Sequence, residues 1–135
     1  MTKQFGFGKK EKLKSRKRIE ELFTKGKSFV VFPLRVIYQI LPSDEEPILQ
    51  VGVTAGTKYF KKAVERNRIK RLLREAYRLQ KTGLSETVRQ KRKNVFLFFM
   101  YTDKIIPPFN VIKESMNNCL KRVEQKLSDI DENII

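Results

Sequence analysis

Apolar residues recur at helical spacing in three parts of the chain. The first part follows Ser15, which can cap a helix, places Ile19, Leu22 and Phe23 on one side and ends at Gly26. The second and most periodic part runs from about Lys62 to Gln80 and stops near Gly83. The third predicts a last amphipathic helix whose apolar side carries Val111, Ile112, Met116, Cys119, Leu120, Val123 and Leu127.

Between these helices the pattern favours strands. Phe29 to Leu41, broken or bent at Pro33, and Ile48 to Thr54 are rich in β-branched and aromatic residues, and we interpret them as a hairpin with a long loop. Residues 94–101, NVFLFFMY, form a continuous apolar run that predicts a buried central strand. Leu84 to Arg92 is a short helix or a solvated loop. The order of the predicted elements is helix, strands, helix, strand, helix. It predicts a fold of the α/β class in the broad sense, in which helices pack on a sheet as in an α+β sandwich.

The pattern predicts one folded unit over residues 13–127. Residues 1–12 mix glycines and lysines without periodicity and suggest a flexible arm, and residues 128–135 suggest a frayed acidic tail. A chain of 135 residues can bury one core without disulfides, and its single cysteine, Cys119, suits a buried apolar position. The longest apolar run, Val95 to Tyr101, is far shorter than the roughly 20 residues of a membrane span, so we expect a soluble cytoplasmic protein.

The net charge of the chain indicates what it binds. The sequence has 30 Lys and Arg residues but only 15 Asp and Glu residues, and the formal charge of +15 predicts a polyanionic ligand. On a helical wheel with Arg66 at zero, the core arc of about 220° to 340° holds Ile69, Leu72, Leu73, Ala76 and Leu79. Asn67, Lys70, Arg71, Arg74 and Arg78 occupy about 40° to 140°, and Arg66 and Arg68 lie on the two flanks. The face carries no acid, and its length of roughly 18 Å can follow several phosphates, of either RNA or DNA.

The segment KKAVERNRIKRLLREAYR, residues 61–78, resembles the signature of the bacterial ribonuclease P protein, with Arg-Asn-Arg followed closely by Lys-Arg and Arg-Glu. LFTKGKSF before the strands and VGVT before the signature extend the resemblance to roughly residues 7–127. The resemblance implies a four-stranded sheet packed by helices, similar to the second domain of ribosomal protein S5. It also implies an unusual left-handed βαβ crossover that contains the signature helix, against the right-handed rule.

The resemblance further implies the protein component of an endoribonuclease that removes the 5′ leader of precursor tRNA. Its implied partners are the catalytic RNA subunit and precursor tRNA, with neither DNA nor membrane. The implied contacts to catalytic RNA are Lys62, Arg66, Asn67, Arg68, Lys70, Arg71, Arg74 and Arg78. The leader is expected in a cleft between the first helix and the sheet, where Phe23, Tyr38 and Lys58 are the matching residues. Phe23 is equally compatible with a core position.

Two positions depart from the family pattern. Ile19 stands where relatives often carry an aromatic residue, and residues 54–62, TAGTKYFKK, replace a Ser-Lys-Lys type of turn. The aromatic residues of NVFLFFMY are assigned to core or sheet packing.

The chain offers no obvious catalytic group of its own. It has no histidine, and its carboxylates are scattered, so we expect neither a protein catalytic residue nor a protein metal site, with Mg²⁺ bound mainly by the RNA. Other interpretations of the basic helix are a merely solvated face, a structural ribosomal protein, a DNA-binding regulator and a scaffold domain for an acidic protein. A DNA reader should offer base-reading residues, and a scaffold should show weak salt dependence.

Overall fold

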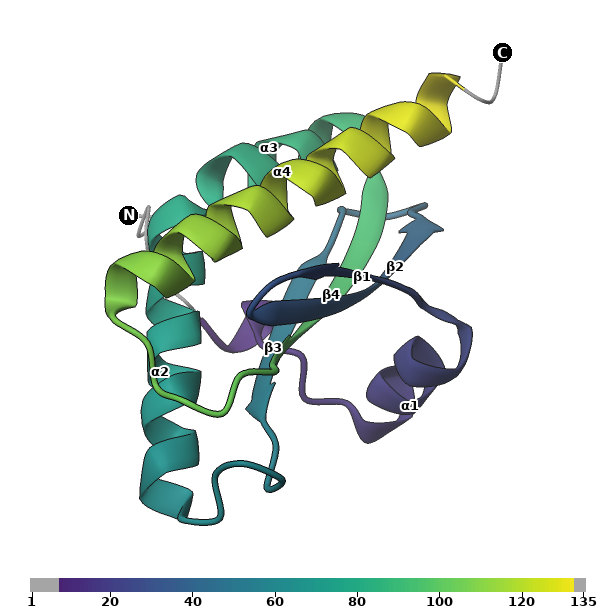
Figure 1. Cartoon of the computed structure of the whole chain (residues 1–135). Helices are drawn as coiled ribbons and strands as arrows, with labels where there is room; N and C mark the ends of the chain where they lie inside the picture. The colour runs from purple at the N-terminus through teal and green to yellow at the C-terminus, as the bar shows by residue number, and fades with distance from the viewer. Residues whose placement is uncertain (1–7, 133–135) are drawn as a thin grey trace.

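A computed structural model describes residues 8–132 of the chain (Figure 1). Four helices, one short 3₁₀ helix and four strands follow one another along these residues. In chain order they are η1 (Lys9–Glu11), α1 (Arg16–Lys25), β1 (Lys27–Val31), β2 (Leu34–Pro42), β3 (Leu49–Ala55), α2 (Ala63–Gln80), α3 (Thr82–Lys91), β4 (Lys93–Tyr101) and α4 (Phe109–Glu132).

The four strands form one mixed sheet in the order β1-β2-β4-β3. β2 pairs antiparallel with β1 and β4, whereas β3 pairs parallel with β4, so α2 and α3 form the crossover between two adjacent parallel strands. The predicted four-stranded sheet packed by helices is confirmed. NVFLFFMY is confirmed as a central strand, with β2 on one side and β3 on the other.

The predicted hairpin of residues 29–41 with 48–54 is wrong. The hairpin lies inside the first of these segments, where the chain turns at Phe32 and Pro33 and Val31 pairs with Leu34. β2 and β3 are separated by β4, although they are consecutive in sequence. The reason is burial: β4 is apolar on both faces, and in the centre of the sheet its edges pair with β2 and β3 while its side chains enter a core on each face.

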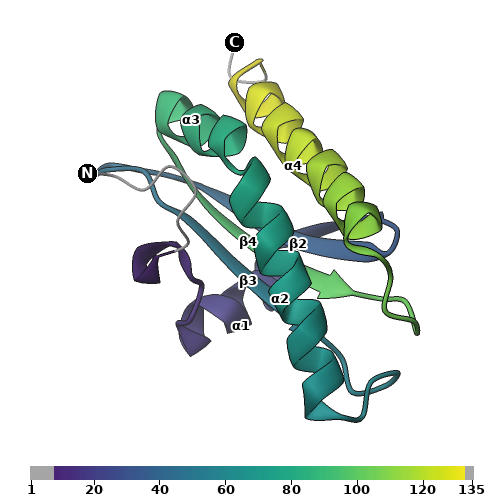
Figure 2. The ribbon, with the colours of Figure 1, turned by 90° about the vertical axis from the view of Figure 1, so that its left-hand side faces the viewer.

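Alternate residues of β4 enter two apolar cores. Val95, Leu97 and Phe99 face the larger core, which α2, α3 and α4 complete, and Phe96 faces a smaller one with Leu13, Leu22 and Ile37. Figures 1 and 2 show the corresponding layers, with α2, α3 and α4 on one face of the sheet and α1 on the other. Because α1 is short, it covers only part of its face.

Most helix predictions are confirmed. Ser15 caps α1 by accepting a hydrogen bond from the Arg18 N–H at 3.2 Å, and α1 ends before Gly26. Of the alternatives left open for residues 84–92, the structure shows the helix, α3.

The buried side of α4 holds all of its predicted residues except Val111, which is exposed in the first turn. Val111 is next to the buried Ile112, but the helical rotation of 100° per residue turns its side chain towards solvent. α4 also continues through residues 128–132 of the expected tail, whereas residues 1–7 of the expected arm lie outside the described part.

Candidate nucleic-acid interface

Helix α2 lies along the β3 edge of the sheet and buries one narrow face. Ile69, Leu73, Ala76 and Tyr77 are fully buried, whereas Leu72 is half-buried and Leu79 is exposed. The buried arc is therefore rotated by about 50° from the predicted one, towards Tyr77. The Tyr77 ring packs against Phe99 of β4, with ring centroids 6.3 Å apart, and its large area outweighs that of Leu79 at the end of the helix.

The rotation changes which cations point to solvent. Asn67, Arg68, Arg71 and Arg74 are exposed on α2, and Lys62 is exposed just before it. The half-buried cations are Arg66, Lys70 and Arg78. Arg68, which the sequence placed on a flank, thus lies on the exposed face together with Arg71.

Arg66 is engaged within the protein. Its guanidinium donates hydrogen bonds of 2.8 Å to the backbone carbonyls of Phe60 and Lys61. These bonds hold the loop between β3 and α2 against the first turn of the helix. The first arginine of the signature therefore shapes the loop, with fewer donors left for a ligand.

Arg78 is paired with an acid, which corrects the prediction of an acid-free face. Its Nε and Nη2 atoms donate to the two carboxylate oxygens of Glu75, at 3.2 and 2.5 Å. This hydrogen bonding lowers the pKa of Glu75 from its ordinary value, so the carboxylate stays ionised beside the cations. Arg78 is consequently a weaker candidate for phosphate contact than Arg71.

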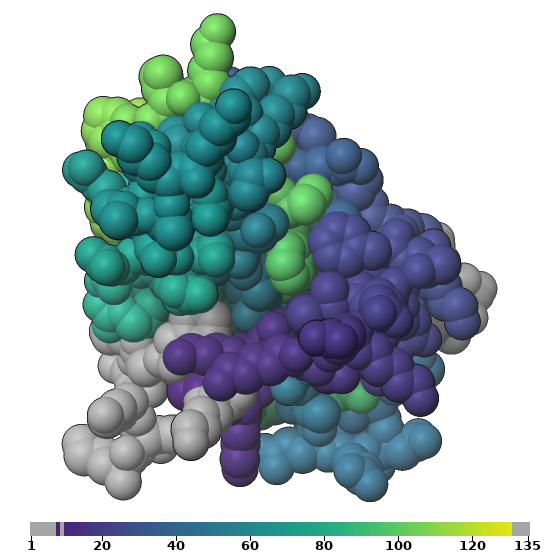
Figure 3. All heavy atoms as spheres, turned by 90° about the horizontal axis from the view of Figure 1, so that it is seen from below, coloured from purple at the N-terminus to yellow at the C-terminus, as the bar shows by residue number. Residues whose placement is uncertain are grey.

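A cleft of about 340 Å³ opens beside this face, on the side of the sheet that α1 leaves partly uncovered. α1 contributes Ile19, β3 contributes Gly52, β4 contributes Phe98 and α2 contributes Arg74, while Lys12 and Lys14 lie at its rim. Figure 3 shows atoms of β4 between α1 and α2, where this face of the molecule is hollowed. An apolar floor edged by cations suits a single nucleic-acid strand, because bases stack and phosphates pair with cations.

The floor of the cleft depends on the absence of a side chain at Gly52. A Cβ atom at Gly52 would lie 2.8 Å from two ring carbons of Phe98, so glycine lets this ring lie across β3. Phe23, which is 47% exposed, meets the edge of the same ring with centroids 5.2 Å apart. The sequence interpretation missed Phe98 and Gly52. The alternation of residues 96, 98 and 100 in the apolar strand was the available signal, because it places them on the α1 face.

Tyr38 and Lys58 do not join Phe23 in this cleft. Tyr38 is buried on the opposite face of the sheet, where its ring packs against Phe29 at 5.8 Å between centroids. Lys58 lies in the loop before α2, with its ammonium 5.3 Å from the Tyr59 ring centroid, and it does not line the cleft. Of the three residues expected at the leader, the structure places Phe23 alone beside the cleft.

Two further features are absent from the part of the chain that the structure describes. Its described side chains include no group of three or more Cys, Asp or Glu residues arranged to hold a metal ion. No helix in the same part of the chain is long and apolar enough to cross a bilayer.

Comparison with known proteins gives one consistent family. The Ribonuclease P family model matches residues 7–124. The ribonuclease P protein component of Porphyromonas gingivalis is 37% identical over 119 residues, which cover 88% of this chain and 87% of the relative. That of Chlorobaculum tepidum is 33% identical over 114 residues, covering 78% of this chain and 74% of the relative.

Solved structures support the same fold. The ribonuclease P protein from Thermotoga maritima has a TM-score of 0.63 at 24% identity, covering 83% of this chain and 96% of its own. The Staphylococcus aureus protein has a TM-score of 0.60 at 20% identity, covering 84% and 94%. With the family model matching most of its length and relatives above 30% identity covering most of it, the chain belongs to the ribonuclease P protein family.

Proposed function

We propose that this chain is the protein component of ribonuclease P, that it binds the catalytic RNA through α2, and that it holds the leader of precursor tRNA in the cleft beside α1. The RNA contacts on α2 and at its N-cap are Lys62, Asn67, Arg68, Lys70, Arg71 and Arg74, with smaller contributions from Arg66 and Arg78. The leader contacts are Phe23, Ile19 and Phe98.

The observation that carries this proposal is the position of Arg74. Its side chain is exposed on the cationic face of α2 and also lines the cleft over the Phe98 floor. The two features are therefore continuous across one residue. A substrate strand in the cleft would lie directly beside an RNA bound to α2, which is the arrangement that cleavage at the leader junction requires.

The protein's contribution is binding and positioning. The chain has no histidine to act as a general base near neutral pH, and we assign the hydrolysis, with its Mg²⁺ ions, to the RNA subunit. The cations reduce the repulsion between two RNA strands, and the cleft adds contacts that only a substrate with a leader can make. Precursor tRNA is thereby bound more tightly than mature tRNA, whose leader is gone.

Two substitutions separate the two contacts. Arg71→Ala is expected to weaken binding to the catalytic RNA and to reduce the slope of log affinity against log salt by about one, the value for one lost phosphate contact. Phe23→Ala is expected to leave that binding unchanged and to reduce the preference for precursor over mature tRNA. Arg74→Ala is expected to do both.

Lys121→Ala on α4 is the matched control, because it removes one exposed charge away from both features. Binding is measured by filter retention across a salt series, and cleavage at low Mg²⁺ with the catalytic RNA. Equal slopes for the Arg71 and Lys121 variants would contradict the role of α2. Cleavage rescued equally well by an unrelated basic protein would favour a generic RNA-binding protein.

A further inference from the structure

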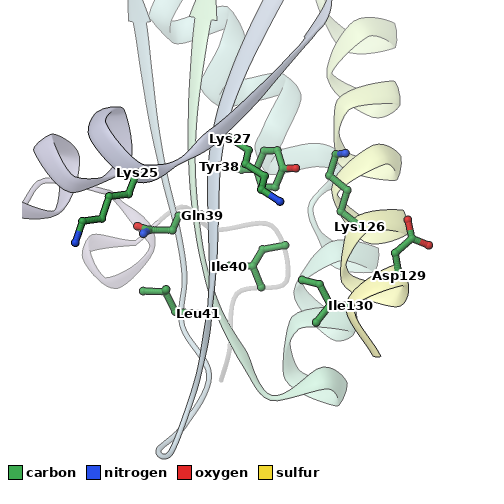
Figure 4. A pocket seen from close by; sticks show the side chains of 9 residues that line it. All are labelled: Lys25, Lys27, Tyr38, Gln39, Ile40, Leu41, Lys126, Asp129 and Ile130. Carbon is green, nitrogen blue, oxygen red and sulfur yellow. The ribbon is translucent and has the colours of Figure 1, made fainter. Parts of the chain in front are cut away.

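A second basic hollow lies at the opposite edge of the sheet from α2. It measures about 420 Å³ and is formed by the end of β2, the corner between α1 and β1, and the last turns of α4. Lys25, Lys27 and Lys126 line it together with Tyr38 and Ile40 (Figure 4). A hollow of this size is within the range of roughly 300–1,000 Å³ that small ligands occupy.

The hollow exists because β1 is shorter than β2. The pairing of β1 with β2 ends at Lys27 and Tyr38, whereas β2 continues to Pro42 and pairs only with β4 on its other side. The chain leaves the sheet at Gly26, where a Cβ atom would lie 2.3 Å from the Leu22 carbonyl oxygen and 3.0 Å from that of Tyr38. The edge of β2 beyond Tyr38 is therefore uncovered by any described strand.

The described side chains that line this hollow carry more positive than negative charge. Among the side chains that the structure describes, none of the three lysines has a carboxylate partner within ion-pair distance. Asp129 is the acid among the lining side chains, and it accepts a hydrogen bond of 3.0 Å from Gln125. Three ammonium groups against one carboxylate favour an anionic ligand.

One of the cations is held in place by the fold. The Lys126 ammonium lies 5.4 Å from the ring centroid of Tyr38 and 5.9 Å from that of Phe29. Lys27 is on the same face of the sheet, because it is two residues before the buried Phe29 in β1. In Figure 4, Lys27 and Lys126 lie around the Tyr38 ring, while Lys25 lies with Gln39 on the other side of the strand. The ligand would thus lie across the strand edge with cations on both sides.

We infer that this hollow, formed by the β2 edge with Lys25, Lys27 and Lys126, is a second RNA contact that binds the phosphodiester backbone of a segment separate from the one on α2. The inference rests on the proposal that the chain binds RNA. At the hollow the uncovered edge of the sheet is β2, and two strand spacings, about 10 Å, separate it from β3, beside which α2 lies, so we assign the hollow to a different RNA segment from the one along α2. Its ligand is either another part of the catalytic RNA or a part of precursor tRNA outside the leader.

The test compares two pairs of lysines of equal charge. Lys27→Gln with Lys126→Gln is expected to reduce the salt slope of RNA binding by about two, and Lys27→Gln alone by about one. The control pair, Lys113→Gln with Lys121→Gln, removes two exposed α4 charges outside the hollow and is expected to leave the slope unchanged. Lys27 is exposed, so its single variant tests the site even if the Lys126 substitution disturbs packing.

Two arms identify the RNA. The slope of log affinity against log salt is measured first for catalytic RNA binding to the protein, and then for precursor tRNA binding to the assembled complex. The RNA whose slope falls in the lysine variants is the ligand of the hollow. Equal losses from both lysine pairs would overturn the inference. Unchanged salt slopes for both RNAs, together with increased self-association of the variant protein, would also overturn the inference. The lysines would then serve to prevent the uncovered edge of β2 from pairing with another copy of the protein.

A 20-residue polyglutamate peptide serves as the probe for the protein alternative. If it binds wild-type protein but not the double variant, while the RNA slopes stay unchanged, the site is for an acidic protein and the inference fails. The Arg71→Ala result is independent of all these arms. A failure of the second contact is therefore distinguishable from a failure of the proposed function.

Discussion

Gly52 determines how the floor of the cleft is built, because its missing side chain makes room for the Phe98 ring. Phe98 in turn supports Phe23, the exposed aromatic residue of α1. The absence of a Cβ atom at Gly52 thus determines where the Phe98 ring lies and, through it, the shape of the cleft.

Gly52→Ala is expected to push the Phe98 ring out of its place and to cost about 1–3 kcal/mol of unfolding free energy, as for other small-to-large changes in packed positions. The preference for precursor over mature tRNA should fall with it. Gly56→Ala is the control, because the nearest atom to a Cβ at Gly56 is 4.0 Å away. Urea denaturation and competition binding measure the two effects, and identical behaviour of both variants would contradict this role of Gly52.

Among the elements, α2 combines exposed charges, which we propose bind RNA, with charges that hold its own structure and the preceding loop. Arg71 and Arg68 are exposed, whereas Arg66 holds the preceding loop and Arg78 holds Glu75. Similar residues in one signature thus have different roles, which only their neighbours reveal.

Glu75→Gln is expected to strengthen binding to the catalytic RNA and to increase the salt slope by up to one. The reason is that the substitution removes the carboxylate that holds the Arg78 guanidinium, which can then meet a phosphate. The double variant Glu75→Gln with Arg78→Ala should lose this gain. A gain that persists in the double variant would show that the carboxylate acts by repelling RNA, independently of Arg78.

The sequence predicted α2 closely, because its period is long and regular, and placed most of its exposed cations correctly. The core arc was less accurate, since Tyr77 was left out of a face that was defined by aliphatic residues. The strand neighbours could not be read from the pattern, because the local preference for hairpins favoured pairing β2 with β3. The handedness of the crossover came from the resemblance alone, and generic rules favour the opposite hand.

The residues of the cleft could not be predicted from the sequence, because only the fold brings them together. Ile19, Gly52, Phe98 and Arg74 come from four elements, and no spacing in the sequence brings them together. Tyr38 was matched to the cleft by position, but the side-chain period of two places it on the other face of its strand.

At the scale of the whole molecule, buried ionisable groups connect folding to alkaline pH. Burial raises the pKa of the Cys119 thiol from 9.0 to about 12 and that of Tyr101 from 10.0 to about 12. Both groups keep their protons in the folded protein at a pH where the unfolded chain loses them. Their contribution to stability is complete below about pH 9 and is lost as the pH rises towards 12.

Cys119→Ala is therefore expected to lower stability at pH 8, because it leaves a cavity, but to flatten the fall in unfolding free energy between pH 9 and 11. The comparison is made with wild-type protein at each pH, so that the loss of lysine charge, which acts on both chains, cancels. Urea denaturation followed by circular dichroism provides the measurement. Parallel curves for the two proteins would show that the thiol does not contribute.

The strand order also bears on how the protein is made. β4, at residues 93–101, is the only strand that β3 pairs with in the sheet, and it joins β3 to the β1–β2 hairpin. A ribosome that has released the first 90 residues has therefore produced a strongly cationic helix and two strand groups that cannot yet meet. The sheet can close only after β4 has been synthesised, so the nascent chain exposes the cationic face of α2 before its fold is complete.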